Sequence, residues 1–143
     1  MQKNGIYEGV IENVGKNGEG IIKDNGYVVF VPYTVLGEKI RYKALKVDKK
    51  IVYAKVLEVL TPSTERVEPV CSVFTKCGGC QLQHVKYDAQ LKIKRQTVED
   101  CFRKIAFIDT QVEKTVACEK PYGYRNKLQL PVAEGVNGVA IGF

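Results

Sequence analysis

The feature that most constrains how this chain folds is a succession of short strand patterns in residues 5–60, separated by turn signals. Strands are expected over five segments: residues 5–14, 21–23, 27–31, 39–47 and 51–60. Asn25-Gly26, between two of them, is a strong signal for a two-residue hairpin turn. Five strands in about 55 residues cannot bury both faces of an open sheet, so we expect them to close into a small barrel.

The second part of the chain is predicted to begin with a linker and a helix. Residues 61–70 contain Pro62 and Pro69 among charged residues and are expected to form the linker. Apolar residues at helical spacing predict a helix over residues 88–105. The buried stripe expected on this helix, from which Ile93 is offset, consists of Leu91, Val98, Cys101, Phe102 and Ile105.

Beyond the helix the pattern returns to strands. They are expected over residues 111–118, 124–130 and 136–143, the last with an Asn137-Gly138 turn signal. The chain stops inside this apolar strand, which predicts a boundary within a longer protein. The expected fold class is mostly β with an α+β second part: a barrel, a cysteine loop, one helix and an incomplete antiparallel sheet.

Charge and hydropathy limit the partners. The 22 Lys and Arg residues outnumber the 16 Asp and Glu residues, giving a formal net charge of +6. This balance favours a polyanionic partner, because cationic side chains release the counterions condensed on phosphates. No apolar run is long enough to span a membrane, and the N-terminus lacks the apolar core of a secretory signal. A cytoplasmic protein without a membrane partner is expected.

Three of the five cysteines lie within ten residues, at Cys71, Cys77 and Cys80. The two glycines between Cys77 and Cys80 permit the positive φ angles of a tight turn, from which two thiolates can meet one metal centre. Thiolates are soft ligands that suit iron–sulfur clusters or zinc, and both normally take four ligands. Reduced, clustered cysteines therefore predict a metal site that lacks one ligand.

Three residues are candidates for the missing ligand. Cys101 lies on the predicted apolar face of the helix and is expected to be a core residue. Cys118 lies at the end of a predicted strand and could reach the site. His84 is expected at the surface or beside the ligands rather than among them.

Residues 71–90 resemble the cluster segment of bacterial rRNA uracil-C5 methyltransferases, which belong to the class I SAM-dependent enzymes. The matching residues are Cys71-x5-Cys77-Gly-Gly-Cys80-Gln-Leu-Gln-His84, then Tyr87, Gln90 and a basic helix. Residues 5–60 resemble the TRAM domain, an OB-like barrel, in three stretches: Gly15-x-x-Gly18-x-Gly20-Ile21, Val29-Phe30-Val31-Pro32 and Gly37-Glu38-x-Ile40. Leu36 stands where the barrel motif usually has proline. Residues 122–127 resemble the opening of the family's central domain.

The resemblance implies three parts: a TRAM barrel that binds RNA (residues 1–60), a linker (61–70), and an iron–sulfur segment with the truncated start of the central RNA-binding domain (71–143). It implies that Cys71, Cys77 and Cys80 hold a [4Fe–4S] cluster, whose fourth cysteine lies downstream. The S-adenosylmethionine site and the catalytic residues also lie downstream. The segment alone is therefore expected to be inactive, and the parent enzyme is expected to methylate uracil C5 in RNA, with 23S rRNA as the substrate.

Barrels of the oligonucleotide-binding type hold single strands with a basic groove and aromatic platforms. Tyr33, in a loop, is the aromatic residue expected to be most exposed. A strand over residues 124–130 would place Arg125, Lys127 and Gln129 on one face. The residues expected to contact RNA are Lys16, Tyr33, Arg41, Lys43, Arg125, Lys127 and Gln129.

Other hypotheses stay open at this point. One is a stand-alone RNA-binding protein with a structural zinc site completed by Cys118, and another is a structural fragment whose cysteines are empty. The glycine-rich residues 15–20 join two strands and open no helix, so they predict a turn and not a nucleotide cradle. A second copy of the chain is an expected partner through the edge of the incomplete sheet, as a non-native dimer.

Overall fold

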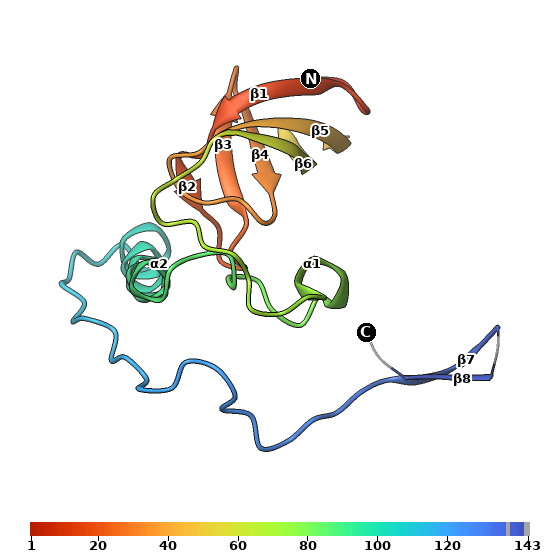
Figure 1. Ribbon diagram of the computed structural model, residues 1–143. Coiled ribbons are helices and arrows are strands. Elements are labelled where there is room, and N and C mark those ends of the chain that lie inside the picture. The colour runs from red at the N-terminus through yellow and green to blue at the C-terminus, as the bar shows by residue number, and fades with distance from the viewer. Residues whose placement is uncertain (137, 142–143) are drawn as a thin grey trace.

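A computed structural model describes residues 1–136 and 138–141 of the chain. Six strands precede two helices and a π-helical turn, and a two-stranded hairpin follows (Figure 1). The elements are β1 (Ile6–Val10), β2 (Asn13–Val14), β3 (Gly20–Asp24), β4 (Tyr27–Val31), β5 (Lys39–Asp48), β6 (Ile51–Thr61), α1 (Phe74–Cys77), α2 (Tyr87–Cys101), η1 (Phe102–Ala106), β7 (Val132–Gly135) and β8 (Gly138–Ile141). The predicted turn residue Asn137 and the predicted strand residues Gly142 and Phe143 lie outside the described residues.

The first six strands form one sheet in the order β1-β5-β6-β4-β3-β2. The strand predicted over residues 27–31 coincides with β4. β5 and β6 are each one residue longer than predicted at one end, and β3 is one residue longer at both ends. The strand predicted over residues 5–14 divides into β1 and β2 at Ile11. There the buried Ile11 donates its N–H to the carbonyl of Glu38 at 2.9 Å.

The sheet curls, because its two outer strands are consecutive along the chain. β1 pairs antiparallel with β5, whereas β2 pairs antiparallel with β3. Between them the N–H of Glu12 donates to the carbonyl of Ile21 at 2.9 Å. β4 and β6 are parallel neighbours, so the strand order is not a simple meander. The predicted mostly β fold is confirmed.

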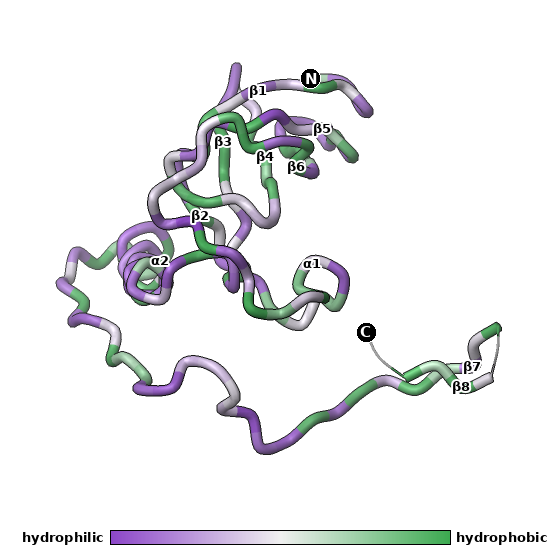
Figure 2. The backbone as a smooth tube through the Cα atoms, in the orientation of Figure 1, coloured by the Kyte–Doolittle hydropathy of each residue, from purple (hydrophilic) through white to green (hydrophobic). Residues whose placement is uncertain are grey.

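Alternating burial along the strands builds the main core, and the strands carry many of the hydrophobic residues of the chain (Figure 2). Val29 and Val31 of β4 are fully buried, and Val52 and Ala54 of β6 face the same core. The buried core residues are Ile11, Ile22, Val29, Val31, Ile40, Tyr42, Ala44, Val52 and Ala54. Burial raises the pKa of Tyr42 to about 12 and leaves its ring inaccessible to a ligand.

The predicted hairpin turn at Asn25-Gly26 joins β3 to β4. Both residues have positive φ, 48° for Asn25 and 79° for Gly26. Positive φ at both central residues matches the twist of the flanking strands and explains the Asn-Gly sequence.

A second, smaller core joins the helical part to the sheet. Val35 follows β4, and it is buried together with Val85 and Ala89. Leu82 and Ile93 pack against these three residues. The loop after β4 therefore holds the start of α2, and this contact fixes where the helix lies.

The predicted helix over residues 88–105 is present as α2 continued by η1, but its predicted buried face is wrong. The helix turns Ala89 and Ile93 toward the core, and not the expected stripe. Cys101 is exposed, and Ile105 is 74% exposed. Apolar spacing identifies a helix, but the element packed against it decides which face is buried.

The strands predicted over residues 111–118 and 124–130 are wrong. Residues 107–131 contain no helix or strand. Instead, the Thr115 hydroxyl donates to the Leu91 carbonyl at 3.0 Å, and the Cys118 N–H donates to the Tyr87 hydroxyl at 2.8 Å. A strand needs a hydrogen-bonding neighbour strand, and no strand of the described chain pairs with residues 107–131.

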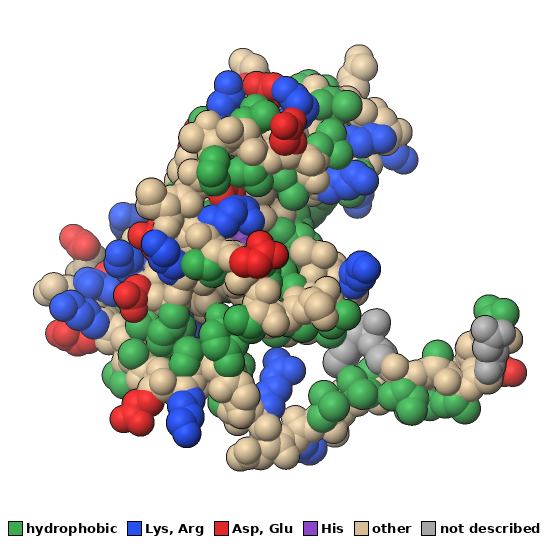
Figure 3. Space-filling model, in the orientation of Figure 1, with side chains coloured by type: hydrophobic (Ala, Val, Ile, Leu, Met, Phe, Trp, Pro, Cys, Tyr) green, Lys and Arg blue, Asp and Glu red, His purple; other side chains and the backbone are tan. Residues whose placement is uncertain are grey.

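In place of the predicted incomplete sheet, the described residues contain the β7–β8 hairpin, in which β8 falls within the strand predicted over residues 136–143 and β7 was not predicted. Its apolar side chains, including Val132, Val139 and Ile141, are exposed. Figure 3 shows the hairpin as a mostly hydrophobic projection beside the body of the molecule. No helix within the described residues is long and apolar enough to cross a membrane.

Candidate functional site

The site begins with a buried ion pair that fixes residues 61–70 to the sheet. The Glu38 side chain is 0% exposed, and that of Arg66 is 28% exposed. Arg66 donates from Nε and from one terminal nitrogen to the two Glu38 carboxylate oxygens, at 2.6 and 2.8 Å. The N–H groups of Val35 and Ser63 donate to the same carboxylate at 2.8 and 3.3 Å. The expected linker is thus bound to the six-stranded sheet.

The electrostatics of Glu38 follow from these contacts. Burial alone would raise the pKa of the Glu38 carboxyl, but the hydrogen bonds from Arg66 and the backbone, with the charge of Arg66, outweigh it. The pKa of Glu38 is held below its usual value, so the carboxylate stays ionised and paired. Arg66 also donates to the Tyr33 carbonyl at 3.0 Å, which ties this pair to the loop after β4.

His84 extends this contact into the cysteine loop. It is buried, so of its two predicted positions the one at the surface is wrong, and its Nε2 lies 3.2 Å from the Thr34 carbonyl. Its ring packs against two aromatic rings, with centroids 5.5 Å from Phe74 and 6.3 Å from Tyr33, and these two rings also contact each other. Burial lowers the pKa of His84, so the imidazole is neutral in this setting. Tyr33 is half-buried in this cluster and is not the exposed platform that the sequence predicted.

The cysteine loop itself carries three half-buried free thiols, Cys71, Cys77 and Cys80. α1 ends at Cys77, and Gly78 follows with φ of 74°, as the predicted tight turn requires. Cys101 and Cys118 are exposed, and the Cys118 thiol donates to the Lys120 carbonyl at 3.3 Å. Among the described residues, no three or more His, Cys, Asp or Glu side chains form a group that could hold a metal ion.

The glycine-rich residues 15–20 form a turn, and this turn touches the cysteine loop. Glu19 occupies the donors of the turn: its carboxylate accepts from the Asn17 N–H at 2.9 Å and from the Asn17 amide at 3.0 Å. Gly18 has φ of 84°, and a Cβ there would lie 2.8 Å from a methyl group of Leu82. Glycine is needed at position 18 for its dihedral angle and for this close approach.

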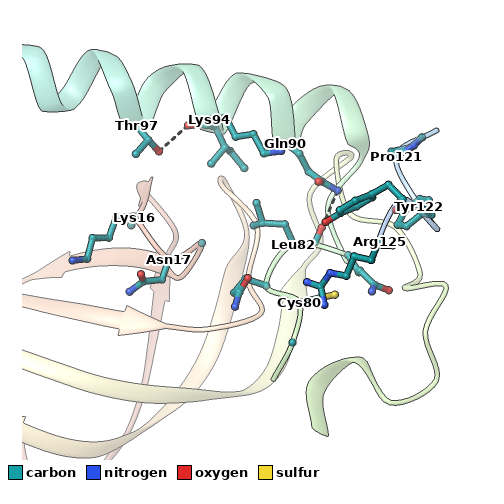
Figure 4. A pocket seen from close by; sticks show the side chains of 17 residues that line it. Lys16, Asn17, Cys80, Leu82, Gln90, Lys94, Thr97, Pro121, Tyr122 and Arg125 are labelled. Carbon is teal, nitrogen blue, oxygen red and sulfur yellow. Dashed lines mark hydrogen bonds between the residues drawn. The ribbon is translucent and has the colours of Figure 1, made fainter. Parts of the chain in front are cut away.

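A cleft of about 570 Å³ opens where four segments converge (Figure 4). They are the glycine-rich turn, the loop at residues 79–83, one face of α2, and residues 121–125. Gln90 supports the cleft floor, because its amide donates to the carbonyls of Leu82 and Val85 at 3.1 and 2.9 Å. Gln83 also lines the cleft, and its Oε1 is buried without a donor among the described residues.

Two of the predicted RNA-contact residues meet in this cleft. Lys16 lines it from the glycine-rich turn, and Arg125 lines it from the segment 121–125 (Figure 4). Lys127 and Gln129 are exposed but do not line it, and without a strand they share no face with Arg125. Lys16, near the start of the sequence, and Arg125, near its end, therefore each contribute one cation to the cleft.

The other predicted cations lie on the sheet. Arg41 is bound by two carboxylates, with N–O distances of 3.0 Å to Glu8 and 2.6 Å to Glu58. These ion pairs engage the guanidinium, so Arg41 is a weaker candidate than the sequence suggested. Lys43 lies two residues after Arg41 on β5. It is half-buried and forms no ion pair among the described residues.

The sequence interpretation missed several cleft residues. Gln90, Lys94 and Thr97 of α2 line the cleft, and so do Tyr122 and Tyr124. Gln90, Lys94 and Thr97 have spacings of four and three, which places them on one helical face. The spacing is present in the sequence, but it does not reveal which segments face this side of the helix.

Comparisons with known proteins can be set beside this geometry. The chain is 46% identical over 143 residues to an RNA methyltransferase of Clostridium tetani, covering 100% of this chain and 31% of that protein. A Listeria monocytogenes RNA methyltransferase is 43% identical over 144 residues, with 32% of that protein covered. The chain thus spans about a third of the length of the curated relatives it matches. The predicted resemblance to RNA methyltransferases is confirmed.

A solved structure is similar over most of the chain. The tRNA (uracil-54, C5)-methyltransferase of Pyrococcus abyssi, in complex with S-adenosyl-L-homocysteine, aligns with a TM-score of 0.59 and 29% identity. The match covers 95% of this chain and 28% of that chain. No protein-family model matches the chain.

Proposed function

We propose that this chain, which matches RNA methyltransferases along its whole length, is the RNA-binding and iron–sulfur-binding N-terminal part of a SAM-dependent RNA uracil-C5 methyltransferase. The observation that carries the proposal is the 46% identity over all 143 residues. The structural similarity to a uracil-C5 methyltransferase over 95% of the chain supports the chemistry. The S-adenosylmethionine site, the catalytic nucleophile and the general base are proposed to lie outside this chain, which spans about a third of its relatives' length.

The division into parts follows the sequence prediction. Residues 1–60 are proposed to form an OB-like TRAM barrel. The support is the curled sheet, in which the consecutive strands β1 and β2 are the two outer strands. Residues 61–70 connect it to residues 71–143, the cluster segment and start of a central RNA-binding domain. The Glu38–Arg66 pair and the His84 contacts support a fixed connection between the two parts.

The cleft beside the cysteine loop is the proposed RNA site. Lys16, Lys94 and Arg125 can bind phosphates, and phosphate contacts dominate nucleic-acid affinity. Tyr122 and Tyr124 are exposed rings on which bases can stack.

The cysteines are proposed to hold a [4Fe–4S] cluster. Three free thiols in one loop supply the soft ligands that iron–sulfur clusters take, and each thiolate binds its own iron, so the three need not converge on one point. A fourth ligand comes from the rest of the protein. A bound cluster would join Cys71 to the turn at Cys77 and Cys80 and so stiffen one wall of the cleft. Zinc completed by Cys118 has less support, because no described group could hold one metal ion.

The substrate is proposed to be 23S rRNA, met in the cytoplasm. The solved relative acts on tRNA, so tRNA is the competing substrate that an assay must include. In the isolated chain, the exposed apolar hairpin β7–β8 is proposed to pair with a second copy. In the whole protein the same hairpin would be covered by the rest of the central domain.

A matched pair of lysines on α2 tests RNA binding at the cleft. Lys94 lines the cleft and Lys92, exposed on the same helix, does not. We expect Lys94→Ala to weaken binding of a uracil-containing RNA hairpin and to reduce the log–log salt slope by about 1, because one phosphate contact is lost. Lys92→Ala is expected to change neither quantity. Fluorescence anisotropy across a salt series measures both, and equal effects of the two substitutions would contradict the site.

A further inference from the structure

The outer face of the sheet carries a second ordered surface, apart from the cleft. Ile21, Phe30, Tyr53 and Lys46 lie opposite one another across β3, β4, β6 and β5. They point outward, because their neighbours along the strands, such as Val29 and Val52, are buried in the core. One row of four strands therefore presents an aliphatic, two aromatic and one cationic side chain side by side.

The two aromatic rings of this row are stacked on each other. The centroids of Phe30 and Tyr53 are 5.9 Å apart, and the ring planes differ by 23°. Tyr53 is 49% exposed, which is high for an aromatic residue in the middle of a sheet. The pair, named here the aromatic platform, offers a flat exposed ring that nothing in the described chain covers.

Lysines surround the aromatic platform. Lys46 lies opposite Tyr53, Lys23 lies in the next outward position of β3, and Lys55 in the next outward position of β6. All three are exposed, and none forms an ion pair within the part of the chain that the structure describes. A carboxylate also lies nearby: Asp48 is two residues after Lys46 on β5, opposite Ile51. The contrast with Arg41, which two carboxylates neutralise, makes this patch the more available cationic surface.

We propose that the aromatic platform and its lysines bind a single-stranded segment of the RNA substrate, with bases stacked on Tyr53 and Phe30 and phosphates on Lys23, Lys46 and Lys55. The inference rests on the proposed function and adds a second contact surface to the cleft. Stacking on exposed aromatic rings within a cationic surface is how sheets hold single strands without reading their sequence. The occupant is a polyanion with flat apolar groups, because charge and aromaticity occur together here.

Substitutions at Tyr53 separate stacking from charge. In the full 143-residue chain, Tyr53→Leu is expected to weaken binding of a single-stranded uracil-rich RNA about tenfold, with the salt slope unchanged. Tyr53→Phe keeps the ring and is expected to stay within about twofold of the parent affinity. Lys46→Ala is expected to reduce the salt slope by about 0.7. Leu57→Ala, an exposed apolar position of β6, is the control and is expected to change neither quantity.

Cross-linking of a 5-iodouracil oligonucleotide, followed by mass spectrometry, supplies a second readout: the proposal expects adducts at Tyr53 or Phe30. If Lys94→Ala weakens salt-dependent RNA binding and Tyr53→Leu leaves the affinity unchanged, the proposal for the aromatic platform is wrong and the proposed function stands. Absence of RNA binding by the chain would overturn both. A dimer that Tyr53→Leu dissolves in sedimentation, with RNA affinity unchanged, would identify the platform as a protein interface and also overturn the proposal.

Discussion

Replacing Arg66 with alanine is expected to lower the free energy of unfolding by about 3–5 kcal/mol, because it leaves the Glu38 carboxylate buried without its counter-ion. The carboxylate is 0% exposed and loses both hydrogen bonds from the guanidinium, leaving only the two backbone N–H donors. Urea unfolding followed by circular dichroism measures the loss. The matched control is Arg95→Ala, which breaks a half-exposed ion pair with Glu99 and is expected to cost about 0.5 kcal/mol or less.

The same pair predicts opposite pH dependences in the parent and the variant. In the parent, the folded-state pKa of Glu38 is lowered, so its contribution is present above the unfolded pKa and is lost as pH falls through the folded pKa. Without Arg66, burial is the largest remaining influence on this carboxyl, so we expect the folded-state pKa of Glu38 to rise. Acidification then neutralises the buried charge, so mild acid is expected to recover part of the stability of Arg66→Ala.

A double substitution checks that the unpaired charge is the cause. Glu38→Gln added to Arg66→Ala removes the charge and keeps the size of the side chain, so the double variant is expected to be more stable than Arg66→Ala alone. The free energy of unfolding of the double variant is compared with that of the parent. If the loss equals the sum of the losses in the two single variants, the residues act independently and the account of the ion pair is wrong.

Anaerobic reconstitution with iron and sulfide is expected to load the chain with a cluster that Cys77→Ser almost abolishes. The reason is that Cys71, Cys77 and Cys80 are the three clustered thiols, and losing one leaves two ligands for four irons. Iron and sulfide content and visible absorbance measure the loading. With one iron lacking a protein ligand, the cluster is expected to be lost in air.

Cys101→Ser and Cys118→Ser are the controls for this prediction, since both thiols are exposed and lie outside the cysteine loop. Each is expected to load iron as the parent does. Full loading of Cys77→Ser, or an equal loss in Cys118→Ser, would contradict the assignment of ligands. The second outcome would instead support the alternative in which Cys118 is the fourth ligand of a zinc site.

The parts of the fold that could be predicted are those fixed by neighbours in sequence. The strands of residues 20–61 and the Asn25-Gly26 turn follow from alternation and from the dihedral angles that glycine and asparagine permit. The residues that hold the two parts together are not local: Glu38 and Arg66 are 28 positions apart, and Thr34 and His84 are 50 apart. No periodicity connects such pairs.

The errors have a common physical origin. The predicted strands at 111–118 and 124–130 had suitable residues but no neighbouring strand to pair with, so their backbone groups face solvent or α2 instead. The predicted stripe on α2 had suitable spacing, but the described chain has no element to cover Val98 or Ile105. In the site, the motif residues Lys16 and Arg125 were identified, whereas Lys94 was missed because its role depends on what faces it.

The central claim is that this segment serves a uracil-C5 methyltransferase, and tritium release tests it most directly. The whole protein that contains the segment is incubated with S-adenosylmethionine and RNA tritiated at C5 of uracil, using 23S rRNA and tRNA transcripts in parallel. Methyl transfer to C5 displaces the C5 hydrogen, so the account predicts SAM-dependent tritium release by the whole protein and none by the isolated 143-residue chain. Methylation of RNA by the whole protein without tritium release, or release by the isolated chain, would contradict it.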